Sequence, residues 1–247
     1  MSSYQDSSAS GQDSGPELAL ETSRREASLA LGVGSLVLED ELGAAAHARD
    51  LVPRLARLLE RAGVERGSGN LGLRAVFVGL GPGSYTGLRV GIATALALAR
   101  ASGAALYGLS SFEALAFEAL EVDSEGTVAL DARAGRFYHA RYRRVEHGLL
   151  VLDPPSTCGA EELAERCARA RVVLGHPELA SAAGLALASS SVLRTDARPC
   201  ARALLELGRA RRAIGEIAPQ ASLEPLYLVG FGRSGSGREP GQRCAGR

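Results

Sequence analysis

The stretch GLGPGSYTGLRVG, residues 79–91, has the composition of a phosphate-binding loop. It joins an apolar run of strand length to a helical run, so the N–H groups of a helix N-terminus, capped by Ser84 or Thr86, could face an anion. A P-loop needs a lysine, however, and the chain has none; a dinucleotide-binding loop needs a third glycine where Thr86 stands. The loop therefore allows two interpretations. It could form an anion site at Gly81, Gly83 and Ser84, or its glycines could serve only a tight turn and close packing, which is the interpretation that we favour.

Other residue types that could do chemistry lack the spacing for it. No histidine pair has H-x-x-x-H spacing, no G-x-S-x-G sequence presents a nucleophilic serine, and the four cysteines show no metal-ligand pattern. We therefore expect no metal site and reduced, structural thiols. Asp131, beside Arg133 and Arg136, could be a functional carboxylate, but a salt-bridged strand end is the simpler interpretation.

The helix after the glycine loop carries a stripe of small residues. Gly87, Gly91, Ala95 and Ala99 recur every four positions and so share one face, which another helix could approach closely. The stripe is compatible with burial against the protein's own sheet or with a subunit interface, and composition does not separate the two.

The elements that position these residues form two α/β units in succession. The order up to residue 120 is βββαβαβα, and a strand pair, a strand, a helix, a strand and a last helix follow. Strands are expected at 17–22, 27–32, 35–42, 73–80, 105–110, 127–133, 136–145, 149–153 and 171–175. Helices are expected at 47–63, 88–103, 111–120, 160–170 and 200–216. Ser110 and Glu113 have the spacing of a capping box.

We expect two lobes, each a mixed sheet flanked by helices. They span residues 17–115 and 116–228, the final helix packing back on the first lobe, and disordered tails cover 1–16 and 229–247.

Composition excludes several function classes. The 247 residues carry 28 basic and 28 acidic side chains, so no overall field draws the chain onto nucleic acid unaided. No apolar run reaches the length of a membrane span and the N-terminus does not read as a signal peptide, which favours a cytoplasmic location.

Four segments resemble the TsaB (YeaZ) family, bacterial subunits needed to make threonylcarbamoyladenosine in tRNA. The block at 79–116, which contains the glycine loop, closely resembles the signature block of that family. ALDARAGRFYHARY at 129–142 resembles its second signature, LALETSRREASLAL at 18–31 its first hairpin, and EPLYLV at 224–229 its C-terminal Pro-x-Tyr-Leu. The resemblance covers most of residues 17–228 in the right order.

The resemblance implies an actin-like ATPase (ribonuclease H-like) fold. It also implies a noncatalytic partner of TsaD, the transferase subunit, whose pattern includes the H-x-x-x-H pair that this chain lacks. The ATPase TsaE and, through the complex, tRNA are the further partners. A homodimer in the absence of TsaD stays open. The resemblance implies no cofactor for this chain alone. ATP or ADP could bind to the complex.

The resemblance also assigns residues. It places the TsaD interface on the two helices of the first lobe, at His47, Leu51, Leu55, Gly87, Gly91 and Ala95. Glu21 matches the carboxylate with which actin-like ATPases hold the metal of a nucleotide, which gives a vestigial or partner-completed anion site at Glu21, Gly81, Gly83 and Ser84. The alternative function is an enzyme acting alone, either an ATP-dependent phosphotransferase or ATPase, or a glycoprotease-like hydrolase.

Overall fold

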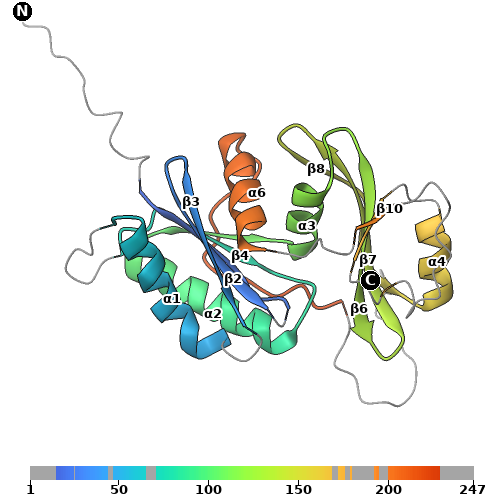
Figure 1. The fold of residues 1–247 in the computed structure, drawn as a ribbon, viewed down its shortest axis with the longest axis horizontal. Coiled ribbons are helices and arrows are strands. Elements are labelled where there is room, and N and C mark those ends of the chain that lie inside the picture. Colours follow the sequence, from blue (N-terminus) through green and yellow to red (C-terminus); the bar gives the residue numbers. More distant parts are fainter. Residues whose placement is uncertain are drawn as a thin grey trace, which may run out of the picture.

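The computed structural model describes residues 15–24, 26–43, 47–64, 71–168, 172–175, 179, 192–194 and 200–228. Within these stretches the chain forms two five-stranded sheets, each with helices packed on it (Figure 1). Up to residue 119 the elements follow the βββαβαβα order expected from the sequence. The predicted class, two mixed sheets flanked by helices, is confirmed.

The first sheet has the strand order β3-β2-β1-β4-β5. Its strands are β1 (Glu17–Glu21), β2 (Ala27–Val33), β3 (Leu36–Leu42), β4 (Ala75–Gly79) and β5 (Ala105–Leu109). The first three form an antiparallel meander, and β4 and β5 lie parallel to β1. A parallel neighbour needs a crossover connection, which α2 (Tyr85–Ser102) supplies between β4 and β5.

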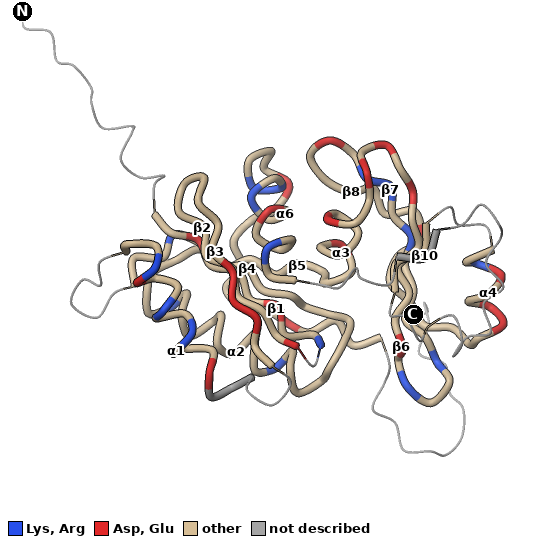
Figure 2. The backbone as a smooth tube through the Cα atoms, in the orientation of Figure 1, with Lys and Arg blue, Asp and Glu red and all other residues tan. Residues whose placement is uncertain are grey.

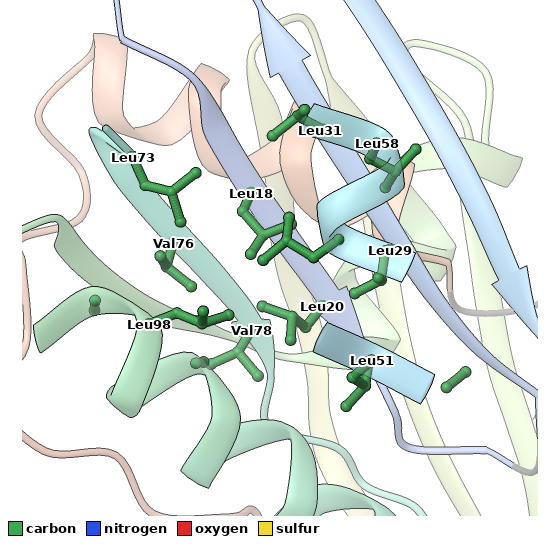
Figure 3. Packing of buried hydrophobic residues seen from close by; sticks show 14 of the residues in the cluster. Leu18, Leu20, Leu29, Leu31, Leu51, Leu58, Leu73, Val76, Val78 and Leu98 are labelled. Atoms are coloured by element: carbon green, nitrogen blue, oxygen red, sulfur yellow. The ribbon is translucent and has the colours of Figure 1, made fainter. Parts of the chain in front are cut away.

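The two faces of this sheet carry different helices because strand side chains alternate between faces. Leu18 and Leu20 of β1 lie in one apolar cluster with residues of α1 (His47–Arg61) and α2 (Figure 3). Ala19 lies in a second cluster with Leu204 of α6 (Ala201–Ala213), on the opposite face. None of the helices in the described stretches has both the length and the apolarity needed to cross a bilayer.

The second sheet has the order β10-β9-β6-β7-β8. Its elements are β6 (Glu125–Arg133), β7 (Arg136–Val145), β8 (Gly148–Cys158), α4 (Ala160–Ala168), β9 (Val172–Leu174) and β10 (Val192–Arg194). The predicted end of β8 at residue 153 is wrong, because Pro154 and Pro155 lie on an edge strand, where a missing N–H donor is tolerated. β10 was not predicted, since three residues are too short to show periodicity.

Helix α3 (Ser111–Ala119) packs on both units. Ala114 belongs to the apolar cluster of the first sheet, whereas Leu115 and Ala116 belong to that of the second. The lobe boundary expected between residues 115 and 116 thus falls inside this helix. Ser110 caps it, accepting the N–H of Phe112 at 3.3 Å.

The predicted capping box is wrong in its second half, because the carboxylate of Glu113 binds Arg211 of α6 through two hydrogen bonds of 2.9 and 3.1 Å. The two side chains are only 15% and 8% exposed.

Arg211→Ala is expected to lower the free energy of unfolding by about 3 kcal/mol, because removing one partner of a largely buried ion pair leaves the other charge uncompensated. Arg202→Ala, on the same helix, is the matched control. Its side chain is 51% exposed and pairs with exposed carboxylates, so its loss should stay below about 1 kcal/mol. Urea unfolding measures both, and equal losses would contradict the role of burial.

Candidate functional site

The glycine loop leads from β4 into α2. Ser84 is the N-cap of α2, since its Oγ accepts the N–H of Gly87 at 3.3 Å, which confirms one of the two predicted caps. The peptide bond between Gly81 and Pro82 is cis. Because β4 ends at Gly79 and α2 begins at Tyr85, the loop brings the N-terminus of α2 to the carboxyl end of β4, the place where an anion would be bound in a phosphate loop.

The loop, however, is closed onto its own chain. The N–H of Ser84 donates to the carbonyl oxygen of Ser23 at 2.6 Å, and the N–H of Gly81 donates to Oγ of Ser111 at 3.2 Å. A Cβ built on Gly83 would lie under 3.0 Å from the backbone of Ser23, so the glycine is needed for this approach. The N–H groups of Gly81 and Ser84 are thus engaged within the protein and are not available to a phosphate group.

Beneath the loop lies Glu21, a fully buried carboxylate at the end of β1. Its Oε1 accepts the N–H of Ser23 at 2.7 Å, while no hydrogen bond of ordinary geometry from a described residue reaches Oε2. Burial raises the pKa of Glu21, and the nearby hydroxyls of Ser23 and Ser111 act in the opposite direction. The candidate residues Glu21, Gly81, Gly83 and Ser84 thus do come together, and they are linked through contacts with Ser23 and Ser111.

This carboxylate gives a pH-dependent prediction. Because its folded-state pKa is raised, the native state binds more protons at Glu21 than the unfolded state does between the ordinary and the raised pKa. The contribution of Glu21 to stability is therefore highest below this window and falls as pH rises through it. Glu21→Gln carries no titrating group at this position and should remove this fall. Above the window, the free energy of unfolding of the variant should therefore rise relative to wild type by about 1.4 kcal/mol per unit of pKa shift. Urea unfolding from about pH 4 to pH 8 measures the difference, and Glu161→Gln at an exposed glutamate is the control. Parallel pH profiles would refute the prediction.

The residues assigned to the TsaD interface lie mostly inside the first lobe. Leu51, Leu55 and Ala95 are at most 2% exposed and belong to the cluster between α1, α2 and the sheet. Gly87 and Gly91 face Thr22, and a Cβ on either glycine would lie under 3.0 Å from it.

The assignment is therefore revised, because the small-residue stripe packs against the protein's own β1 end. His47 begins α1, but its side chain lies outside the described residues.

Comparison with known proteins decides the relationship. The family model described as TsaD, tRNA N6-adenosine threonylcarbamoyltransferase, matches residues 40–190, more than half of the chain. The chain belongs to this family. Within it, the chain is 29% identical over 226 residues to the tRNA threonylcarbamoyladenosine biosynthesis protein TsaB of Escherichia coli (strain K12), covering 85% of this chain and 93% of that one. The TsaB protein of Haemophilus influenzae is 33% identical over 133 residues, 51% of this chain and 53% of the relative.

Solved structures agree with the TsaB (YeaZ) assignment. YeaZ from Pseudomonas aeruginosa superposes with a TM-score of 0.72 at 25% identity, covering 86% of this chain and all of the other. The resemblance to TsaB (YeaZ) and the actin-like fold that it implies are confirmed.

The exposed positions of α1 and α2 lie on the helix faces away from the buried cluster. On α2 the exposed positions Ala93 and Ala97 are one turn apart, and on α1 Val52 is 58% exposed. The two helices contact each other on the same side of the sheet (Figure 1). The outward face of α2 therefore carries small side chains at Ala93 and Ala97, which the spacing of the glycines does not indicate.

A second exposed feature lies beside the glycine loop. The guanidinium of Arg89 lies 4.2 Å from the ring centroid of Tyr85 and donates to the hydroxyl of Tyr227 at 3.2 Å, and the two rings are 5.2 Å apart. The N–H of Leu226 also donates to the carbonyl of Leu80 at 2.8 Å. The Pro-x-Tyr-Leu segment near the C-terminus thus holds the loop from outside.

The remaining candidates have structural roles. Asp131 accepts the N–H of Arg133 at 2.7 Å, so the expected salt bridge is replaced by a turn hydrogen bond, and Arg136 instead donates to Thr157. Cys158 and Cys167 are buried and free, as expected of structural thiols. In the described part of the chain, no three His, Cys, Asp or Glu side chains gather closely enough to hold a metal ion.

Proposed function

We propose that this chain is the noncatalytic, activating subunit that binds TsaD in the complex forming N6-threonylcarbamoyladenosine in tRNA. The complex works in the cytoplasm with TsaE as its ATPase, and tRNA is contacted mainly by the assembly. The relatives that support this proposal are biosynthesis proteins for the same modification. The chain itself supplies a scaffold and a docking face rather than reacting groups.

The observation that carries the proposal is the closure of the glycine loop. The N–H of Ser84 donates to the carbonyl oxygen of Ser23, and Gly83 packs against the same residue, so the loop is fastened to the segment that follows β1. A loop held shut by its own chain fixes the N-terminus of α2 and so gives that helix a defined position. This supports a helix that is used as a rigid docking element.

The docking face that we assign consists of Val52, Ala93 and Ala97 with their exposed neighbours on α1 and α2. Small side chains on an exposed helix face let a partner helix approach closely, and the exposed apolar valine gains by burial. TsaD belongs to the same family, so its corresponding helices are the natural counterpart.

Co-purification of the chain with TsaD from the same organism, followed by size-exclusion chromatography with light scattering, tests the proposal. We expect a defined heteromer whose mass is that of one chain plus one TsaD, or a multiple of it. A homodimer of the isolated chain that TsaD converts into the heteromer would also agree. If no complex forms with or without nucleotide and tRNA, the proposal fails, and ATP hydrolysis by the purified chain would then favour the phosphotransferase alternative.

A further inference from the structure

Three arginines surround one buried carboxylate at the edge of the first lobe. Glu17, the first residue of β1, is 2% exposed and pairs with Arg74 at 2.7 Å, Arg209 at 2.5 Å and Arg212 at 2.7 Å. Arg74 precedes β4, and the other two lie near the C-terminal end of α6, whose arginine positions appear in Figure 2. We name these four residues the arginine cluster.

The arginine cluster carries an excess of positive charge at the surface. The guanidinium groups of Arg209 and Arg212 alone exceed the single charge of the Glu17 carboxylate by one, and the C-terminal dipole of α6 offsets only part of that excess. The arginine side chains are 20% to 26% exposed, above a carboxylate that is almost fully covered. Burial and the charges of Arg212 and Arg209 lower the pKa of Arg74, as expected where like charges are only partly neutralised.

The geometry suits a phosphate ligand. Each guanidinium is a planar fork with five N–H donors, and Arg209 and Arg212 each contact Glu17 through one nitrogen. Glu17 holds the three guanidinium groups close together, so these side chains lose little conformational freedom when a phosphate binds. Other arginines of α6 differ, because Arg202 and Arg211 each pair with two carboxylates of their own.

We propose that the arginine cluster binds the phosphate backbone of tRNA and thereby helps to place the substrate on the complex. The choice of RNA rather than another polyanion rests on the proposed function. The chain has no net charge, so attraction to RNA would have to come from a local excess of positive charge such as that of the arginine cluster.

Binding of a fluorescently labelled tRNA transcript, followed by anisotropy over a salt series starting at about 50 mM, tests this proposal with the full-length chain and with its TsaD complex. Arg209→Gln with Arg212→Gln should weaken binding about tenfold and reduce the slope of log affinity against log salt by about 2, one for each lost phosphate contact. The matched control, Arg166→Gln with Arg202→Gln, removes two charges from exposed i,i+4 pairs and should leave the slope unchanged.

Glu17→Gln separates a binding role from a structural one. It removes the only carboxylate of the arginine cluster, so we expect tRNA to bind several-fold more tightly, a gain that a purely structural ion network would not produce. If the double variant does not fold, Arg212→Gln, which leaves two arginines on Glu17, should reduce the salt slope by about 1.

No tRNA binding by wild type, or equal effects of the double variant and its control, would overturn the proposal. Complex formation with TsaD is scored separately by light scattering. If no complex with TsaD forms but tRNA binding still depends on the arginine cluster, the result would count against the proposed function alone.

Discussion

Gly87→Ala is expected to lower the free energy of unfolding by about 2–3 kcal/mol, although alanine is the better helix former by about 1 kcal/mol. The added Cβ would lie under 3.0 Å from the backbone oxygen of Thr22, and backbone cannot move aside as a flexible side chain can. The variant therefore loses stability because α2 must move away from the end of β1. Thermal and urea unfolding of the purified variant measure it.

Gly43→Ala is the control for this prediction, because Gly43 has open space where a Cβ would stand. It should change stability by less than about 0.5 kcal/mol. If Gly87→Ala were as stable as wild type, the close contact between α2 and Thr22 would be wrong, and the small-residue stripe would again be open to a partner. Gly91 faces the side chain of the same threonine, so Gly91→Leu tests folding rather than the docking of TsaD.

The sequence was sufficient for those features of the fold that neighbouring residues decide. Apolar runs such as that of β1 and the 3.6-residue spacing of α1 report burial directly, since each element must turn its apolar side to a core. Ser84 was identifiable as a cap because a cap acts on its own helix within three residues. The sequence-based prediction ended β8 before Pro154, although the strand continues to Cys158. Proline is tolerated there because β8 lies at the edge of its sheet, and the position of a strand in a sheet cannot be derived from neighbouring residues.

The candidate site was harder to predict because its partners are distant in the sequence. Glu113 and Arg211 are 98 residues apart, and Arg89 and Tyr227 are 138 residues apart. The helical stripe of Gly87 and Gly91 gave the correct face of α2 for a close approach but could not say what approaches, and the structure supplies Thr22 of the same chain. A periodicity identifies a face, whereas the occupant of that face depends on the tertiary fold.

Ala97→Arg is expected to weaken the complex with TsaD at least about 100-fold, which corresponds to about 3 kcal/mol. Ala97 is exposed on α2 in the proposed docking face, and an arginine there would hold a partner helix away and place a charge in the interface. The stability of the isolated chain should change by less than about 0.5 kcal/mol, since the side chain points to solvent. Titration of TsaD followed by light scattering or calorimetry measures the affinity, and the melting temperature verifies the fold.

Ala213→Arg makes the same chemical change on α6, an exposed helix position on the opposite side of the sheet. It should leave TsaD affinity within about threefold of wild type, because a surface away from the interface contributes little to binding. The pair of variants separates a docking face on α1 and α2 from a general effect of added charge. Equal affinities for both variants would remove this face from the interface while leaving complex formation itself intact. The cluster of Tyr85, Arg89 and Tyr227 beside the glycine loop would then be the next surface to alter.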